Sequence, residues 1–587
     1  MGKRAPISLA HRTTKKINMK KSSFWFLPLL LLLAVTLFSG CSNEAKSTEE
    51  DDDNAPADAR GSLISFQLGT TDYDIIDEDA TRAANDNEKG RVVSSSTENL
   101  GDGLEALVEV VESPTPKAIT RATSNAPAGK YTILAYQNGE QKAKWVLNYN
   151  GSTYTMAEGN KEQYLPTGSY KFYVFNDGVT FANDKIVKSL NSNENALYFE
   201  DDITIPNTKK HKLSFTLKPV FAKMFFKIKG FSNAAFKNDM SGKFVYDANT
   251  IPGTETVDPA NRSNSFANNT AAGSVDVGSF TANIADGTKA SYIKTNNATY
   301  FLPGTDVTKL KFTFNSTAGG QVYGKPVAGK TLSITNAISG NLQAGKSYLV
   351  YVTIYYSAKY LFSDGSVGTL MANKGKTPVA LVVNENASVG EKIAIALKSL
   401  GKTKWAITGA KQNSPNNFKY DISGLRAARD AKKGYDETWN PSQTLNPSNV
   451  IKAQNSNFPA FQAVGYYQYA AGSSTEINGK KWYMPGVYEW WLALKYFGIE
   501  DATDGYSRTG KGPKKHSWGT SLGYQLVEIL FYQVDGDAFD TWYLTADAFG
   551  VQSQHKTAMT ITLNKDDVHF GGATKTDPSP IRAFIRY

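Results

Sequence analysis

Residues 164–176 read Tyr-Leu-Pro-Thr-Gly-Ser-Tyr-Lys-Phe-Tyr-Val-Phe-Asn, a Pro–Thr–Gly turn followed by an alternating segment. Within this segment Tyr170, Phe172 and Val174 stand at every second position. Successive side chains of a β strand point to opposite faces, so these three side chains share one face. The stretch therefore predicts a strand with one buried face, entered through a tight turn.

The same period of two recurs on both sides of this segment. Alternating runs cover residues 213–217, 224–228, 310–314 and 348–355, and two more strands, 131–137 and 144–149, flank a turn at Asn138 and Gly139. Such runs, separated by Gly, Asn and Pro, are typical of antiparallel β sandwiches. A chain of 587 residues is too long for one core. We therefore expect one sandwich over residues 61–230 and a second over 231–356, with the boundary near Gly230. The polar stretch 249–276 is expected to be a surface loop of the second sandwich.

The last part of the chain, residues 357–587, has a mixed pattern. Residues 379–383 and 393–397 are typical of strands, and residues 458–469 and 487–497 are typical of helices. This mixture predicts an α+β domain. The expected fold class is therefore mainly β, with two tandem antiparallel β-sandwich domains followed by an α+β domain.

The N-terminus carries the pattern of an export signal. The apolar residues 24–38 follow Lys20 and Lys21 and precede Ser39, Gly40 and Cys41, which is the one cysteine of the chain. A basic start, an apolar stretch and small residues at the cut describe a secretory signal. With a thiol directly after the cut, the pattern resembles a bacterial lipobox. We therefore expect residues 1–40 to be leader and signal peptide, with the natural start at Met19, and Cys41 to carry a lipid such as palmitate. The alternative is a retained signal anchor with an idle thiol.

Residues 41–60 contain almost no large apolar side chain and include the acidic run Glu49 to Asp53. Such a segment cannot bury enough apolar surface to fold, and its charges repel each other. We predict a flexible acidic tether that holds the folded domains away from a membrane. The acidic run also resembles the signal that sends lipoproteins to the outer face of the outer membrane. The alternative is an ordinary solvated linker.

Composition narrows the classes of partner. The net charge is +9, but the lysines stand one at a time between apolar residues, which argues against a nucleic-acid partner. With a single cysteine, an exported chain must be stabilised by packed cores, not by disulfides.

Two short motifs resemble the fimbrillins, the pilins of type V pili. Residues 164–176 are similar to the "LPxGxYxFYxxN" strand of that family, and residues 344–348 (Ala-Gly-Lys-Ser-Tyr) are similar to the entry into the strand that closes its second domain. The resemblance covers roughly residues 61–356. It implies transthyretin-like sandwiches and other pilin subunits as partners.

The resemblance also implies a mechanism of assembly by donor-strand exchange. Fimbrillins travel as lipoproteins, and an arginine-specific protease then removes the anchor and an early strand, so that a strand of another subunit can fill the groove. Residues 63–68 and 104–111 are candidate early strands, and each precedes a Thr-Arg-Ala tripeptide. We expect processing at Arg121 first and at Arg82 second. The alternative is that both are ordinary loop arginines.

The C-terminal third resembles the C-type-lectin-like domains of bacterial surface lipoproteins. Residues 481–490 (Lys-Trp-Tyr-Met-Pro-Gly-Val-Tyr-Glu-Trp) are similar to "WYLPSxxEW", and residues 581–584 (Ile-Arg-Ala-Phe) are similar to "VRAF". Residues 541–546 stand where "YWSST" is usual but depart from it at Leu544 and Thr545.

Candidate ligand-binding residues in this domain are few. Trp490, Trp518 and Trp542 could stack on sugar rings, and Asp535 and Asp537, with Asp540, offer oxygen ligands in one loop. Core packing and a solvated acidic turn are the alternatives. No catalytic residue, no metal site and no cofactor is expected, because none of the usual spacings is present.

Together these patterns predict a surface-exposed, lipid-anchored protein of the cell outer membrane that enters a fimbrium after processing. It would act in adhesion, as a pilus tip or accessory subunit, with a glycan or a surface protein of a host or another bacterium as possible ligand. The alternative is a non-polymerising glycan-binding lipoprotein of the outer membrane. A glycosidase is a third hypothesis, which no residue spacing supports.

Overall fold

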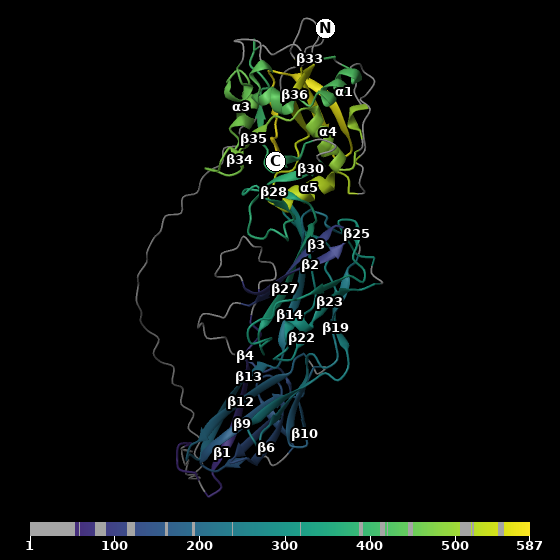
Figure 1. Ribbon diagram of the computed structural model, residues 1–587. Coiled ribbons are helices and arrows are strands. Elements are labelled where there is room, and N and C mark those ends of the chain that lie inside the picture. The colour runs from purple at the N-terminus through teal and green to yellow at the C-terminus, as the bar shows by residue number, and fades with distance from the viewer. Residues whose placement is uncertain are drawn as a thin grey trace, which may run out of the picture. The chain divides into compact units, whose positions relative to one another are not determined.

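The alternating segment at residues 170–174 lies in β9 (Gly168–Asn176), in the middle of a long sheet. The structure is a computed structural model (Figure 1). It describes residues 53–57, 59–74, 76, 90–113, 124–158, 163–190, 194–237, 239–316, 319–386, 391–410, 417–419, 421–443, 450–499, 501–504, 518, 522–549 and 557–587. These residues are mainly β, with antiparallel sheets and a smaller α+β region at the C-terminal end, which confirms the expected fold class.

The sheet that contains β9 coils so that its first strands face its last strands. Its strand order is β4 (Ser124–Asn125), β1 (Ser62–Thr70), β13 (Lys210–Pro219), β12 (Leu197–Ile205), β9, β5 (Gly129–Gln137), β6 (Glu140–Tyr149) and β7 (Tyr154–Glu158), with β8 (Tyr164–Leu165) beside β1. The ring of Phe66 in β1 lies 5.1 Å from the ring of Trp145 in β6. The turn between β5 and β6 has positive φ at Asn138 and Gly139, the geometry for which Asn–Gly is preferred.

A second, smaller sheet is shared between distant parts of the chain. Its strand order is β10 (Thr180–Ala182), β11 (Lys185–Ser189), β17 (Pro252–Asp258) and β18 (Ser263–Asn268). The expectation that residues 249–276 are a surface loop is therefore wrong, because they form β17, β18 and the start of β19 (Gly273–Ser279). All six residues of β18 are exposed, so this strand has no apolar alternation by which the sequence could reveal it.

The second sandwich is built around β27 (Ser347–Tyr356). Its main sheet has the order β2 (Arg91–Gly101), β3 (Leu104–Glu112), β27, β14 (Ala222–Gly230), β21 (Ala290–Lys294) and β20 (Ile284–Asp286), with β22 (Thr299–Phe301) beside β14. A facing sheet has the order β19, β16 (Ser241–Tyr246), β23 (Lys311–Phe314) and β26 (Thr331–Ser333), and a small sheet joins β15 (Phe236–Lys237), β24 (Gln321–Val322) and β25 (Lys325–Pro326). A 3₁₀ turn, η1 (Val307–Lys309), precedes β23.

Two segments belong to a different sheet from the one the sequence pattern predicted. Residues 91–112 and 222–230 were expected within the first sandwich, but β3 and β14 are the two neighbours of β27. β3 runs antiparallel to β27 and β14 runs parallel to it, and the strands lie side by side in Figure 1. The alternation of apolar residues identifies a strand but carries no information about its partner, so the expected boundary near Gly230 could not account for these pairings.

The C-terminal region combines sheets with short helices. One sheet has the order β29 (Val367–Gly368), β28 (Tyr360–Phe362), β30 (Pro378–Asn384), β31 (Ile393–Ala396), β40 (Phe584–Arg586), β35 (Lys480–Tyr483) and β34 (Glu476–Ile477). Another joins β33 (Asn417–Phe418), β36 (Trp542–Phe549), β37 (Thr557–Leu563) and β38 (Val568–Thr574), and β32 (Lys402–Thr403) pairs with β39 (Ser579–Pro580). The helices are α1 (Ile422–Ala431), α2 (Gly434–Trp439), α3 (Pro459–Gly465), α4 (Val487–Tyr496) and α5 (Tyr524–Tyr532), with 3₁₀ turns η3 (Pro441–Gln443), η4 (Lys452–Gln454) and η5 (Ala502–Asp504).

The predicted C-terminal elements are largely confirmed. β30 and β31 match the two expected strands, and α4 covers nearly all of the expected helix 487–497. The other expected helix, 458–469, is shorter than predicted, because α3 ends at Gly465.

Phe312 tests how far the second sandwich depends on aromatic packing. Its side chain is 2% exposed, stacks on Phe226 with ring centres 3.9 Å apart, and meets Phe314 edge to face at 5.1 Å. We expect Phe312→Ala to lower the free energy of unfolding by about 3–5 kcal/mol, measured by urea denaturation. Phe266→Ala, on the exposed β18, is the control and should change it by less than about 0.5 kcal/mol.

Candidate functional site

The strongest candidate for a functional site is the place that β1 occupies in the first sheet. Ile64, Phe66 and Leu68 are buried in the interior of the coiled sheet, while the residues between them point outward. Phe66 packs against Trp145 at 5.1 Å and Tyr154 at 5.6 Å between ring centres. β1 is therefore the strand that fills the interior between the two ends of the sheet.

The backbone of β1 is bound on two sides. It pairs in parallel with β13, from Leu63 opposite Lys210 to Thr70 opposite Leu217, and its other edge meets β8 and β4 only at its ends. Tyr149 of β6 donates a hydrogen bond of 3.3 Å to the carbonyl oxygen of Leu68 across the interior. Without β1, the inner edge of β13 and an apolar slot would be open to a replacement strand.

The second early strand predicted from the sequence, residues 104–111, has a different role. It forms β3, which pairs with β27 over nine residues and with β2 on its other edge. Leu104, Ala106, Val108 and Val110 lie in the core of the second sandwich. The hairpin of β2 and β3 is therefore an integral part of that sandwich, whereas β1 completes the first.

Three of the predicted sites lie outside the described residues. They are the lipidation site Cys41 and the processing candidates Arg82 and Arg121. In chain order, Arg82 stands between β1 and β2, and Arg121 stands between β3 and β4.

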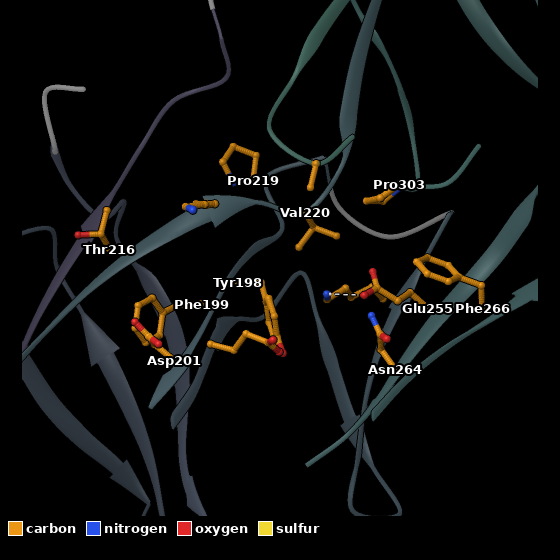
Figure 2. A pocket seen from close by; sticks show the side chains of 14 residues that line it. Tyr198, Phe199, Asp201, Thr216, Pro219, Val220, Glu255, Asn264, Phe266 and Pro303 are labelled. Carbon is orange, nitrogen blue, oxygen red and sulfur yellow. Dashed lines mark hydrogen bonds and ion pairs between the residues drawn. The ribbon is translucent and has the colours of Figure 1, made fainter. Parts of the chain in front are cut away.

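A pocket of about 570 Å³ is lined by strands of the first sandwich together with Pro303 and Ala344 (Figure 2). Lys188, Glu255 and Phe266 stand opposite one another on β11, β17 and β18, and face Tyr198 of β12. The ammonium of Lys188 lies 3.0 Å from a carboxylate oxygen of Glu255 and 3.8 Å from the centre of the Tyr198 ring. The volume is in the range of pockets that hold small molecules.

Most of the tryptophans predicted as ligand-binding candidates are buried and pack against other side chains. Trp490 is fully buried between Tyr543 and Phe584, with ring centres 5.2 and 5.1 Å away. Trp518 is buried and donates a 2.9 Å hydrogen bond to the carbonyl oxygen of Asn564. Trp542 is half-buried in β36. Trp490 therefore has no free ring face, and Trp542 is the most exposed of the three.

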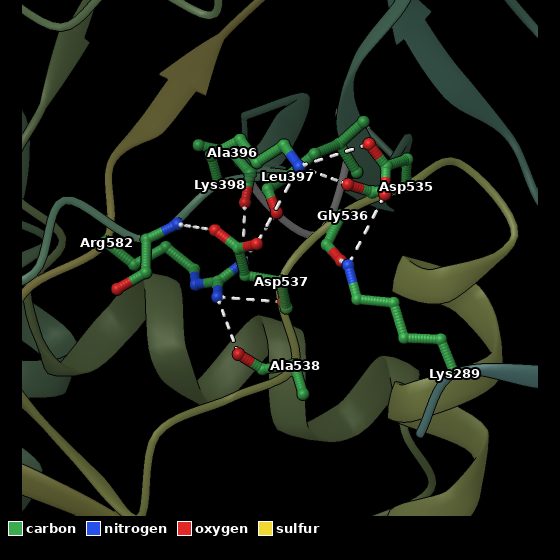
Figure 3. Close-up of polar contacts among 10 residues, drawn as sticks. Lys289, Ala396, Leu397, Lys398, Asp535, Gly536, Asp537, Ala538 and Arg582 are labelled. Carbon is green, nitrogen blue, oxygen red and sulfur yellow. Dashed lines mark hydrogen bonds and ion pairs between the residues drawn. The ribbon is translucent and has the colours of Figure 1, made fainter. Parts of the chain in front are cut away.

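The predicted acidic candidates form a turn that bridges two parts of the chain (Figure 3). Asp535 is 88% exposed and lies 3.4 Å from the ammonium of Lys289, which follows β20. Asp537 accepts a 3.1 Å hydrogen bond from the backbone of Ser399 and lies 3.7 Å from Lys398. The oxygens of this turn are thus engaged by lysines and by backbone N–H groups. Among the described residues no group of three or more His, Cys, Asp or Glu side chains is placed to hold a metal ion.

Arg582 organises this turn from inside the domain, a role the sequence pattern did not reveal. Its buried guanidinium donates hydrogen bonds to the carbonyl oxygens of Ala396 (3.0 Å), Leu397 (3.2 Å), Asp537 (3.0 Å) and Ala538 (3.0 Å), as Figure 3 shows. The arginine of the quoted segment 581–584 therefore holds β31 and the acidic turn together.

A cluster of charged side chains lies inside the C-terminal domain, and each of its members is at most 6% exposed to solvent. It contains Glu437, Lys452, Glu489, Asp547 and Lys575. Glu489 and Asp547 accept hydrogen bonds from two successive backbone N–H groups at the start of α4, those of Gly486 (2.8 Å) and Val487 (2.7 Å). Glu489, which lies within the quoted motif 481–490, is thus a capping residue of the helix.

The environment of the cluster favours neutral side chains. Burial raises the pKa of the Asp547 carboxyl to about 8, and the carboxyls of Glu437 and Glu489 add to the rise, against the Val487 N–H and Lys452. Burial lowers the pKa of the Lys575 ammonium to about 7, and the charge of Lys452 adds to that shift. Desolvation penalises each charged form in the same way.

Comparisons with known proteins were made on the sequence and on the structure. No family model and no curated protein matches the chain. Among solved structures, a fimbrial protein of Bacteroides ovatus is similar at 12% identity over 90% of this chain and 99% of that one, with a TM-score of 0.23. A fimbrial protein of Bacteroides vulgatus is similar at 12% identity over 38% of this chain and 90% of that one, with a TM-score of 0.26. At TM-scores this far below 0.5, neither likeness carries an argument about this chain. In the described part of the chain, no helix is both long and apolar enough to span a bilayer.

Arg582→Lys tests the hydrogen-bonding role of the guanidinium. A lysine keeps the charge but cannot reach all of the carbonyl oxygens, so several of them lose their partner in a buried site. We expect the free energy of unfolding to fall by about 3 kcal/mol, measured by chemical denaturation. Arg262→Lys, at an exposed ion pair with Asp202, should change it by less than about 0.5 kcal/mol.

The pKa of Asp547 predicts a pH dependence of stability. The unfolded carboxyl releases its proton near pH 4 and the folded one near pH 8, so the folded state loses stability as pH rises between these values. We expect Asp547→Asn to reduce this fall, by up to about 1.4 kcal/mol per pH unit, in unfolding measurements from pH 4 to 7. Asp276→Asn, on the exposed part of β19, is the control and should leave the dependence of the unfolding free energy on pH as it is in the unaltered protein. If the two variants show the same dependence on pH, the assignment to Asp547 is wrong.

Proposed function

We propose that this protein reaches the outer membrane as a lipid-anchored precursor, that processing then makes it a subunit of a fimbrium with a role in adhesion, and that it joins its neighbour by exchange of β1. The lipidated residue would be Cys41. The observation that carries the proposal is that β1 buries Ile64, Phe66 and Leu68 in the core of the first sheet, where they pack against side chains of the other strands.

The physical basis of the exchange is the cost of an empty slot. Removal of β1 would expose the faces of Trp145, Tyr154 and Phe215, and would leave the N–H and C=O groups along one edge of β13 without partners. Exposed apolar surface and unpaired backbone both favour capture of another strand. A strand from another pilin subunit with apolar residues at alternate positions would restore both sets of contacts.

Between the two candidate arginines, the arrangement of strands favours Arg82. A cut there separates β1 from the rest of the chain and leaves the hairpin of β2 and β3 in place. A cut at Arg121 would also release β3, and with it the four core side chains that β3 contributes to the second sandwich. We therefore propose Arg82 as the processing site, in place of Arg121, which the sequence alone favoured.

The C-terminal strand supports a position at the tip or as an accessory subunit. β40 is paired on both edges, with β31 and with β35, so it is committed to its own domain. It is therefore a poor donor for a further subunit, in contrast to a free terminal strand. We propose that the C-terminal domain is C-type-lectin-like and binds a glycan or a surface protein without catalysis.

A second candidate function is a non-polymerising glycan-binding lipoprotein. The pocket in Figure 2, with the 47% exposed Phe266 at its rim, favours it. In that case the anchor at Cys41 and the strand β1 would both be retained.

The N-terminal residue of the mature protein on intact cells distinguishes these proposals. We expect it to be Ala83, because a cut after Arg82 releases β1 alone. Arg82→Ala should then block incorporation of the protein into fibres, seen by immunoelectron microscopy, and Arg121→Ala, in the matched tripeptide, should not. A mature protein that begins at Cys41 would reject the exchange of β1 and support the second candidate, and one that begins at Ala122 would reject Arg82 as the site.

A further inference from the structure

The side chains of Glu437 and Lys452 meet inside the C-terminal domain under conditions that are unusual for an ion pair. Glu437 lies in α2 and Lys452 begins η4, and their side chains are 1% and 0% exposed. The Lys452 ammonium nitrogen Nζ is in direct contact with the Glu437 oxygen Oε2. The pair belongs to neither the strand exchange nor the ligand candidates described above.

Besides the other charged members of the cluster, three aromatic rings lie close to the pair. The Lys452 Nζ lies 5.0 Å from the ring centre of Trp405, 5.5 Å from that of Phe458 and 4.9 Å from that of Phe461. The second carboxylate oxygen of Glu437, Oε1, has no hydrogen-bond partner among the described residues. An ionised carboxylate with one unsatisfied oxygen in such a site has a high desolvation cost.

We propose that Lys452 and Glu437 are joined by an amide bond between the Nζ atom and the side-chain carbon Cδ. The contact between Nζ and Oε2 holds the amine beside the carboxyl group, so the two reacting groups are already brought together. The bond would replace two buried charges with one neutral group.

The protonation states in this site suit the reaction. Burial raises the pKa of the Glu437 carboxyl and lowers the pKa of the Lys452 ammonium, against their mutual attraction, so both groups are driven toward their neutral forms. The neutral amine attacks Cδ of the neutral carboxylic acid, the N–C bond forms, and the C–OH bond breaks. The hydroxyl leaves with a proton from the amine as one water molecule, so no oxidant, reductant or other reactant is needed.

A second buried acid belongs to the same cluster. Asp547 interacts electrostatically with both Glu437 and Lys452, its carboxyl keeps its proton at neutral pH, and its oxygen Oδ1 has no hydrogen-bond partner among the described residues. Lys575, also in this cluster, has its Nζ 4.2 Å from the ring centre of Trp405. The bond itself involves only Glu437 and Lys452.

A second buried ion pair in the same chain serves as an internal control. Lys188 and Glu255 are 8% and 7% exposed and lie 3.0 Å apart, but they line the pocket shown in Figure 2 and so have access to water. Solvent water stabilises the charged forms of both side chains, so it disfavours the condensation reaction that would form an amide. We expect this pair to stay unlinked.

The gain for the protein would be a covalent restraint that does not depend on sulfur. The chain has one cysteine and cannot form a disulfide within itself. An amide between α2 and η4 closes the loop between them and restricts the unfolded chain, as a disulfide would.

Trypsin digestion of the full chain followed by mass spectrometry tests the proposal. Trypsin cuts after lysine but not after a lysine whose amine is acylated, and the sequence has no lysine or arginine between residues 453 and 479. We expect one peptide, residues 434–480, lighter than its sequence by the mass of one water. Separate peptides 434–452 and 453–480 with their calculated masses, or an uncut 434–480 at its full calculated mass, would overturn the proposal.

Two controls make the digestion decisive. In Glu437→Ala the bond cannot form, so trypsin should cut after Lys452 whether or not this variant folds. In the unaltered protein trypsin should cut after Lys188, as expected for an unlinked lysine. A missed cut after Lys452 in Glu437→Ala would mean that the resistance does not come from the amide, and would also overturn the proposal.

Discussion

The coiled first sheet needs a strand at the position of β1, and the proposed function follows from this constraint. The interior of the sheet is lined by aromatic side chains of β6, β7, β9 and β13, and Phe66 of β1 touches three of them. A strand with alternating apolar residues is the element that fills such a slot and also satisfies the free edge of β13. In chain order, a segment that includes Arg82 connects β1 to β2, so a cut at Arg82 would free the place of β1 for a strand of another chain, as the proposed function requires.

The second constraint is that the two sandwiches share strands across long distances in the sequence. β17 and β18 extend the sheet of β11 in the first sandwich, although they follow β14 and β16 of the second. The hairpin of β2 and β3 reaches the second sandwich from a position before most of the first. The sandwiches are therefore not two consecutive segments of the chain, and loss of an early segment affects each of them differently. A cut at Arg82 would therefore remove a strand from the first sandwich only, whereas a cut at Arg121 would also remove β2 and β3 from the second.

The C-terminal domain is held together by buried charges as well as by aromatic packing. Arg582 satisfies four carbonyl oxygens in the interior, and Glu489 and Asp547 satisfy N–H groups at the start of α4. These side chains give the short helices and loops defined positions, because each buried polar group requires its partner. Trp490, a ligand candidate in the sequence, is instead part of the core, where its ring packs against Tyr543 and Phe584. The pocket shown in Figure 2, with Phe266 and Tyr198, contains none of the predicted candidates.

The sequence by itself determined which segments are strands and helices where a periodic pattern marked them, as in β9, β14, β23 and α4, and the mainly β class followed from them. It also predicted the turn at Asn138 and Gly139 from the conformational preference of that dipeptide. Only the tertiary structure decided that β3 pairs with β27, that the polar residues 263–268 form a strand, and that Glu437, Lys452 and Asp547 meet in one dry site. Strand pairing and desolvation depend on which distant residues come together, and side-chain alternation within one segment carries no information about those partners.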